Sequence, residues 1–129
     1  MIRAAILLSL AMASGATACP MPSGAIPLTS QTPHAPVAFA QMDALPLSAP
    51  FALTISICDA TTKANSLAFD AHMPAHQHGM NFTVDVAKIA NNRFEVSNVV
   101  FHMPGLWEIR VIIEVSGHRY AYVADVPLG

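Results

Sequence analysis

The sequence predicts an all-β fold, an immunoglobulin-like antiparallel β-sandwich of six to seven strands. Beyond residue 50, hydrophobic and polar side chains alternate with a period of two over several short segments, which is the pattern of half-buried strands. Short turn sequences separate these segments, and no stretch has convincing helical periodicity. With 129 residues, 53 % of them hydrophobic and 11 % charged, the chain has enough apolar material for the core of one small domain.

Residues 1–18 are predicted to be a secretory signal peptide. Arg3 precedes an apolar run over residues 4–13 that is too short to span a bilayer, and an Ala-x-Ala cleavage pattern follows at residues 16–18. The mature chain is then expected to begin at Cys19 and to lie in the periplasm or outside the cell. Without Arg3 it has five Lys and Arg against eight Asp and Glu and no basic cluster, which argues against a nucleic-acid partner.

Residues 19–50 are predicted to form an extended arm that does not pack as an element of the domain, which is expected to span residues 51–129. The arm contains seven of the ten prolines and one charged side chain, Asp43, a composition typical of extended linkers. One exception is Val37–Ala40, which would add the seventh strand at an edge.

The two cysteines, Cys19 and Cys58, leave two alternatives open. Exported chains with two cysteines usually pair them, and a disulfide would fasten the arm to the domain. Cys19 also stands where bacterial lipoproteins receive their lipid, in which case Cys58 remains a lone thiol. Ala16 is a weak match to the Leu that lipoprotein signals usually have at that position, so we favour export without a lipid.

Four strands are expected in the first part of the domain, at residues 51–58, 67–72, 81–89 and 93–101. In the first three, hydrophobic side chains recur at every second position. Asn91 and Asn92 tolerate the positive φ of a tight turn, so the third and fourth strands should form a hairpin.

The last two strands have the clearest pattern. From Trp107 to Val115, every second side chain is hydrophobic, whereas charged residues stand at positions 108, 110 and 114. A turn at Ser116-Gly117 should lead into a strand from Arg119 to Val126, which completes a terminal hairpin.

The segment HMPAHQHGM, residues 72–80, contains three histidines and two methionines. In an extended chain, side chains two positions apart share a face, so His76, His78 and Met80 should point the same way. The same parity continues into the expected core row of Phe82, Val84 and Val86. We therefore expect this row to end in two imidazoles at the rim of the sandwich.

A second group, His102 and Met103, follows the strand at 93–101. Positions 80 and 102 are about equally far from the Asn91-Asn92 turn, so the hairpin should make them near neighbours. Imidazole nitrogen with thioether sulfur suits copper, whereas zinc prefers His with Cys or carboxylate, and calcium and magnesium prefer oxygen. The sequence thus predicts a copper site, with these ligands: His76, His78, Met80, His102 and Met103.

Simpler structural roles are also open for several of these side chains taken singly. Met73 and Met80 are in phase with hydrophobic faces, which would make them core residues. His72 lies on the polar parity of its strand and is a weaker candidate ligand. Trp107 is expected to anchor the core, with shielding of the site as a second role.

The motifs MPAHQHGMN and FHMPGLWEI make the chain similar to the YtkA-like domain family, small exported bacterial proteins with an immunoglobulin-like sandwich. The resemblance covers roughly residues 50–126. The family's Met-Pro-x-His-x-His-Gly-Met motif matches Met73–Met80, and its Phe-His-Met-Pro-Gly-x-Trp motif matches Phe101–Trp107. Relatives often have a Gly-rich turn between the motifs, where this chain has Asn91-Asn92. The resemblance implies a fold more firmly than an activity, and its ligand types, though not their spacing, are similar to those of periplasmic copper chaperones.

We therefore expect an exported protein that binds copper for carriage, buffering or oxidase assembly, with a periplasmic or membrane-bound acceptor protein as its partner. The alternative is a non-metal interaction module in which the His and Met side chains are structural. No catalytic activity is expected, since no Ser, His and Asp arrangement with a nucleophile turn occurs and Glu108 lies on the strand face opposite Trp107. Contact with a membrane is expected only through a lipid at Cys19.

Overall fold

The computed structural model describes residues 19–129, so the predicted signal peptide, residues 1–18, lies outside the described residues. The described chain forms ten strands: β1 (Ile26–Pro27), β2 (Thr29–Ser30), β3 (Ala38–Gln41), β4 (Phe51–Ile57), β5 (Ala64–Met73), β6 (His78–Gly79), β7 (Asp85–Ala90), β8 (Arg93–Val99), β9 (Gly105–Val115) and β10 (His118–Leu128). Within residues 19–129 no helix is long and apolar enough to cross a membrane.

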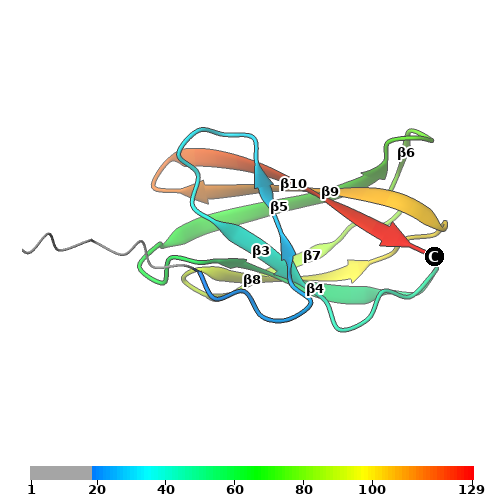
Figure 1. Cartoon of the computed structure of the whole chain (residues 1–129), viewed down its shortest axis with the longest axis horizontal. Helices are drawn as coiled ribbons and strands as arrows, with labels where there is room; N and C mark the ends of the chain where they lie inside the picture. Colours follow the sequence, from blue (N-terminus) through cyan, green and yellow to red (C-terminus); the bar gives the residue numbers. More distant parts are fainter. Residues whose placement is uncertain (1–18) are drawn as a thin grey trace, which may run out of the picture.

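The strands form two antiparallel sheets that face each other as two layers (Figure 1). One sheet has the order β1-β3-β4-β8-β7 and the other the order β2-β10-β9-β5-β6. Without the two-residue strands, the orders β3-β4-β8-β7 and β5-β9-β10 are those of the two sheets of an immunoglobulin-like sandwich. The predicted fold class is therefore confirmed.

The core lies between the sheets and follows from the alternation in the sequence. Leu53 and Ile55 of β4 face Ile109 and Val111 of β9, and all four are at most 2 % exposed. Each such side chain contributes about 1.5–3 kcal/mol by leaving water. The stabilisation from hydrophobic burial thus comes mainly from the strands whose period-two pattern is clearest.

Both predicted hairpins are present. Ala90 pairs with Arg93 across Asn91-Asn92, which joins β7 to β8. Val115 pairs with His118 across Ser116-Gly117, where φ is 49° and 79°. Positive φ at both central residues gives the turn a twist that matches that of the flanking strands.

The arm packs into the sandwich, so the expectation that residues 19–50 lie outside it was wrong. Its two short strands join different sheets, β1 pairing with β3 and β2 with β10, and Leu28 between them is buried. The predicted strand at Val37–Ala40 exists as β3 but is not an edge, because β1 covers its far side. Proline is tolerated here because β1 and β2 are two-residue edge strands that need few backbone donors.

The strand predicted at residues 81–89 begins only at Asp85, and its expected core row is not buried: Val84 is half-buried against the core and the other two side chains are exposed. Phe82 is 53 % and Val86 38 % exposed, and every residue of β7 is exposed. The reason is tertiary: β7 is the last strand of its sheet, and the corresponding edge of the opposite sheet is the two-residue β6. An edge strand with little facing it cannot bury either side.

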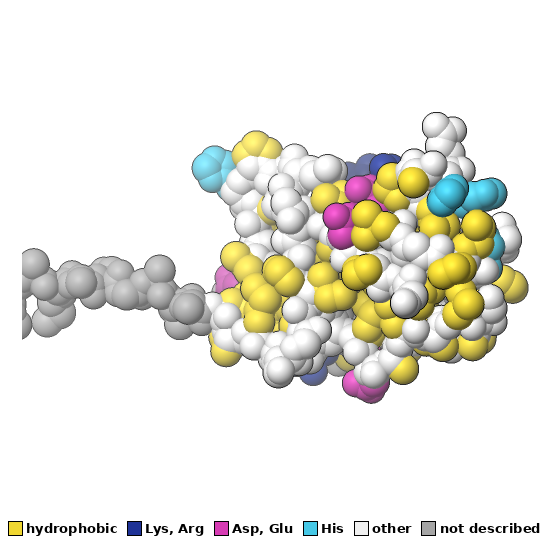
Figure 2. Space-filling view, turned by 45° about the vertical axis from the view of Figure 1, so that its right-hand side comes forward, with side chains coloured by type: hydrophobic (Ala, Val, Ile, Leu, Met, Phe, Trp, Pro, Cys, Tyr) yellow, Lys and Arg dark blue, Asp and Glu magenta, His cyan; other side chains and the backbone are white. Residues whose placement is uncertain are grey.

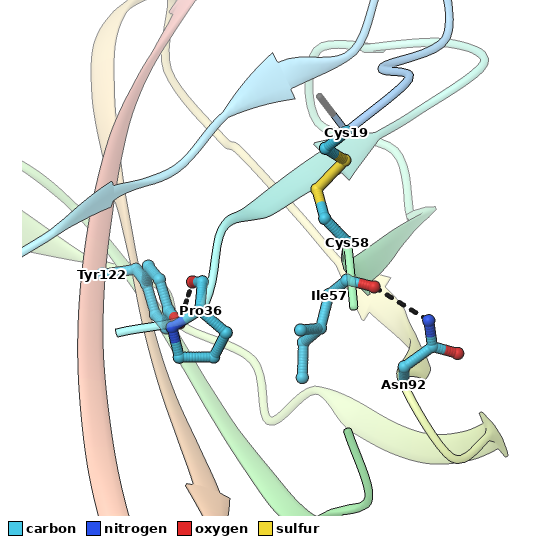
Figure 3. The surroundings of a disulfide bond; sticks show 6 residues. All are labelled: Cys19, Pro36, Ile57, Cys58, Asn92 and Tyr122. Carbon is cyan, nitrogen blue, oxygen red and sulfur yellow. Dashed lines mark hydrogen bonds between the residues drawn. A yellow bond between two sulfur atoms is a disulfide. The ribbon is translucent and has the colours of Figure 1, made fainter. Parts of the chain in front are cut away.

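A disulfide joins Cys19 to Cys58, with 5.4 Å between the Cα atoms (Figure 3). Cys58 directly follows β4, whose first residue lies at the opposite end of the sandwich. Nearby, the Tyr122 hydroxyl donates a 2.6 Å hydrogen bond to the Pro36 carbonyl, and burial, with a smaller effect of Tyr120, raises the pKa of Tyr122 to about 12. Because a lipid on Cys19 would consume its thiol, disulfide and lipid exclude each other in one molecule.

Candidate metal centre

β6 lies at the end of the sandwich that holds the C-terminus (Figure 1), and the three predicted imidazoles are neighbours there. His78 begins β6, His76 lies in the turn before it, and His102 lies between β8 and β9. The ring centroids of His76 and His78 are 6.3 Å apart, and those of His78 and His102 are 6.2 Å apart. The three rings therefore form a row in which His78 is the middle member.

The row does not arise from strand parity, so that part of the prediction was wrong. β5 ends at Met73, the chain reverses over residues 74–77, and His78 pairs back with Met73. The amide of His76 donates to the Met73 carbonyl at 3.2 Å, and Gln77 has φ 53°. A hairpin turn, and not one extended face, thus brings His76 and His78 together.

The hairpin of β7 and β8 positions His102 only indirectly. Its ladder has the expected register but ends at Asp85 and Ser97, so positions 80 and 102 are not ladder partners as predicted. Beyond Ser97, β8 continues beside β4, with Val99 paired to Phe51, and the Asn98 amide group still donates to the Thr83 carbonyl of the segment before β7. His102 therefore lies beside His78 of the opposite sheet.

Aromatic packing fixes the segment that contains His102. Trp107 is fully buried, its ring stacks on Phe101 at 4.5 Å and 4°, and its indole Nε1–H donates to the Met103 carbonyl at 3.0 Å. The rings of His102 and Trp107 meet edge to face, with centroids 5.5 Å apart. The core role predicted for Trp107 is confirmed, and its indole also borders the candidate site.

One nitrogen of His102 is buried without a partner. Of the side-chain polar atoms in residues 19–129, Nδ1 of His102 and Oγ of Ser56 are the two that are buried with no hydrogen bond. A buried polar atom of this kind destabilises the fold by about 1–3 kcal/mol, so a functional explanation is warranted. A metal ion bound at Nδ1 would supply the missing partner.

The methionines of the motifs divide into one core residue and two at the edge of the core. Met73 is 1 % exposed, and its Cε would lie 2.7 Å from a Cβ placed on Gly105, which has φ 130°. Met80 and Met103 are half-buried and pack against the core cluster. They follow His78 and His102 closely in the sequence and are the two motif thioethers that the core does not fully bury.

The distance between neighbouring rings would allow each pair of rings to bind one ion between them. With metal–nitrogen bonds of about 2.0–2.1 Å, two imidazoles on opposite sides of one ion have ring centroids up to roughly 6.4 Å apart. Both observed separations fall just within that limit. In the described residues no group of three His, Cys, Asp or Glu side chains is close enough to hold an ion, so a third ligand would have to be a thioether.

His72, the weaker candidate, lies outside the row. Its Nε2 is 3.3 Å from an Arg110 nitrogen and 3.9 Å from Glu108 Oε1, and Arg110 Nε donates to the same carboxylate at 3.0 Å. His72 pairs with Gly79 while its neighbour Met73 pairs with His78, so His72 faces away from the core. Its polar contacts on the outer face of the sheet leave it no part in the candidate site.

The segments that form the end of the sandwich around the histidines contain no charged side chains, a property that emerges only when the fold brings them together. These segments lack Asp, Glu, Lys and Arg: residues 44–50, 71–84, 98–107 and 126–129. Three large hydrophobic side chains are exposed there, Leu47, Phe82 and Leu106. Figure 2 shows the histidines at the right-hand end bordered by hydrophobic side chains.

Comparison of the chain with family models, with curated proteins and with solved structures gives no match.

Proposed function

We propose that this is an exported protein that binds a copper ion at the His78–His102 pair and carries or buffers it. The observation that supports this most directly is the unpartnered, buried Nδ1 of His102, in a ring 6.2 Å from that of His78. Two imidazoles at this distance suit one ion between them. The protein acts in this proposal as a binding protein, and copper is its cargo.

The donor set and its surroundings favour copper over other ions. Imidazoles with the nearby thioethers Met80 and Met103 form a borderline-to-soft set, which suits the cuprous ion, and no carboxylate belongs to the row. A divalent hard ion would need oxygen ligands that this end lacks. The Cys19–Cys58 disulfide fits an oxidising compartment, in which thioethers remain available while free thiols pair.

The test is a titration of the mature chain followed by the fluorescence of its single tryptophan. Trp107 lies 5.5 Å from His102, so an ion bound there should quench it. We expect saturable one-to-one quenching by cuprous ion under anaerobic conditions, and weak or no response to zinc. His78→Ala and His102→Ala should each weaken binding about tenfold or more, at least the loss that follows removal of an outer-shell partner.

His118→Ala is the matched control, because His118 is exposed and lies beside the β9–β10 turn at the other end of the sandwich. It should bind copper like the unchanged protein. Equal affinity of the His78, His102 and His118 variants would contradict the site assignment.

A protein-interaction module is the second candidate, and the exposed hydrophobic side chains at the uncharged end favour it. An apolar surface of this kind often marks a contact with another protein. In that case copper and zinc would leave the Trp107 fluorescence unchanged, and a chelator would not alter the stability of the purified protein.

A further inference from the structure

We infer that the histidine row is an exchange path, in which His102 is the inner ligand that retains the ion and His76 is the outer ligand through which the ion leaves. This inference rests on the proposed copper binding. It assigns different roles to ligands that the motif alone does not distinguish.

Burial distinguishes the inner end of the row from the other two rings. His102 is half-buried, with its Nδ1 fully buried, whereas His78 and His76 are exposed. The two steps are nearly equal, 6.2 Å from His102 to His78 and 6.3 Å from His78 to His76. An ion can therefore be bridged by the inner pair or by the outer pair, and His78 is common to both.

Movement between the pairs is a single ligand exchange. A copper–nitrogen bond to His76 forms as the bond to His102 breaks, while the bond to His78 persists and the oxidation state of the ion stays the same. No group of three described His, Cys, Asp or Glu side chains is close enough to hold an ion, so in this inference two rings of the row share the ion at a time. An acceptor ligand then replaces His78 at the outer position in the same way.

The inner ring is held firmly. Trp107 packs against His102 and anchors the Met103 carbonyl. On the other side, the amide of Ser48 donates to the Phe101 carbonyl at 2.9 Å and Leu47 forms a β-bridge with Phe101. A rigid backbone on both sides keeps the imidazole oriented, which favours tight binding.

The outer ring is loosely held by comparison. His76 is exposed in a four-residue turn, where its amide bonds to the Met73 carbonyl. In residues 19–129 its ring has no side-chain hydrogen bond or ion pair, whereas the ring of His72 contacts Arg110. A ring with this freedom can follow the ion outward and present it to an incoming ligand.

The test compares equilibrium affinity with the rate of transfer, using chain loaded with cuprous ion and a bulky cuprous chelator, bathocuproine disulfonate, as acceptor. For His76→Ala we expect transfer about tenfold slower, which is the effect of an added barrier of about 1.4 kcal/mol, with a loss of affinity much smaller than that of His102→Ala. For His102→Ala we expect lower affinity and faster transfer. His118→Ala should match the unchanged protein in both measurements.

His76→Gln tests the same role while retaining a polar side chain at the turn, and thermal unfolding checks that each variant is folded. Transfer from the His76 variants at the unchanged rate would overturn the inference. So would a loss of affinity in them as large as in His102→Ala, since His76 would then retain the ion. Failure of the unchanged protein to bind copper would instead refute the proposed function itself.

Discussion

Removal of the disulfide should destabilise the protein mainly through its unfolded state. Cys19 and Cys58 are 39 positions apart, and closing a loop of that length lowers the chain entropy enough to contribute about 4 kcal/mol at 25 °C. In the folded state the arm keeps its other attachments, since β1 and β2 still pair with β3 and β10. The variant Cys19→Ser/Cys58→Ser should therefore keep its fold and lose roughly 2–4 kcal/mol of unfolding free energy.

Urea unfolding followed by Trp107 fluorescence measures this loss as a lower midpoint. The unchanged protein after reduction is the control, and it should unfold at the same urea concentration as the double variant. Copper affinity should stay the same in both, because the disulfide is at the far end of the sandwich from the histidine row. A change of less than about 1 kcal/mol, well below the range typical of disulfides, would refute the reasoning.

Three further predictions concern single side chains. Gly105→Ala should lower the unfolding free energy by about 1–3 kcal/mol and weaken copper binding, because φ is 130° and the new Cβ would meet a methionine methyl at 2.7 Å. Gly79→Ala is the control: its new Cβ meets no atom within 4 Å, so its effect should be near neutral. In urea unfolding, Val96→Ala should lose about 2 kcal/mol and Val86→Ala less than about 0.5 kcal/mol, since Val96 is 0 % and Val86 38 % exposed. The pKa of Tyr122 is about 12 in the folded protein against 10.0 in the unfolded chain. The contribution of Tyr122 to stability should therefore be complete below pH 10.0 and disappear as pH rises through about 12. Ultraviolet titration of tyrosinate and unfolding at each pH would measure this.

The positions of the long strands follow from the sequence because each has a pattern that only one pairing satisfies. The alternation from Trp107 to Val115 admits one buried face, and a shift of one residue would expose it. Ser116-Gly117 fixes the terminal hairpin for a local reason, since few residues tolerate its positive φ values. Asn91-Asn92 forms the other predicted turn, but neither residue has the positive φ that was expected there. The fold class could be derived from these features alone.

The sequence also named the residues of the candidate site, but for a reason that was only partly right. His76 and His78 lie together because of a turn at residues 74–77. This turn contains no glycine, and the alternating positions of the histidines are equally compatible with an extended strand. His102 lies beside His78 because the segment after β8 of one sheet and the edge strand β6 of the other lie at the same end of the sandwich. Whether these side chains bind copper stays a prediction until the titration is done.

Other properties were decided only by the tertiary structure. The hydrophobic pattern of residues 82–86 is as good as that of a core strand, yet Phe82 and Val86 are exposed and Val84 is only half-buried, because only β6 lies at the corresponding edge of the opposite sheet. The Pro-rich arm is buried in part because the edges of β3 and β10 accept it as a pairing partner. The period-two pattern of the sequence indicates which side chains share a face, and this determined where the strands of this protein lie. What covers that face, and whether a nitrogen such as Nδ1 of His102 finds a partner, depends on residues distant in the chain, and only the packed structure determines it.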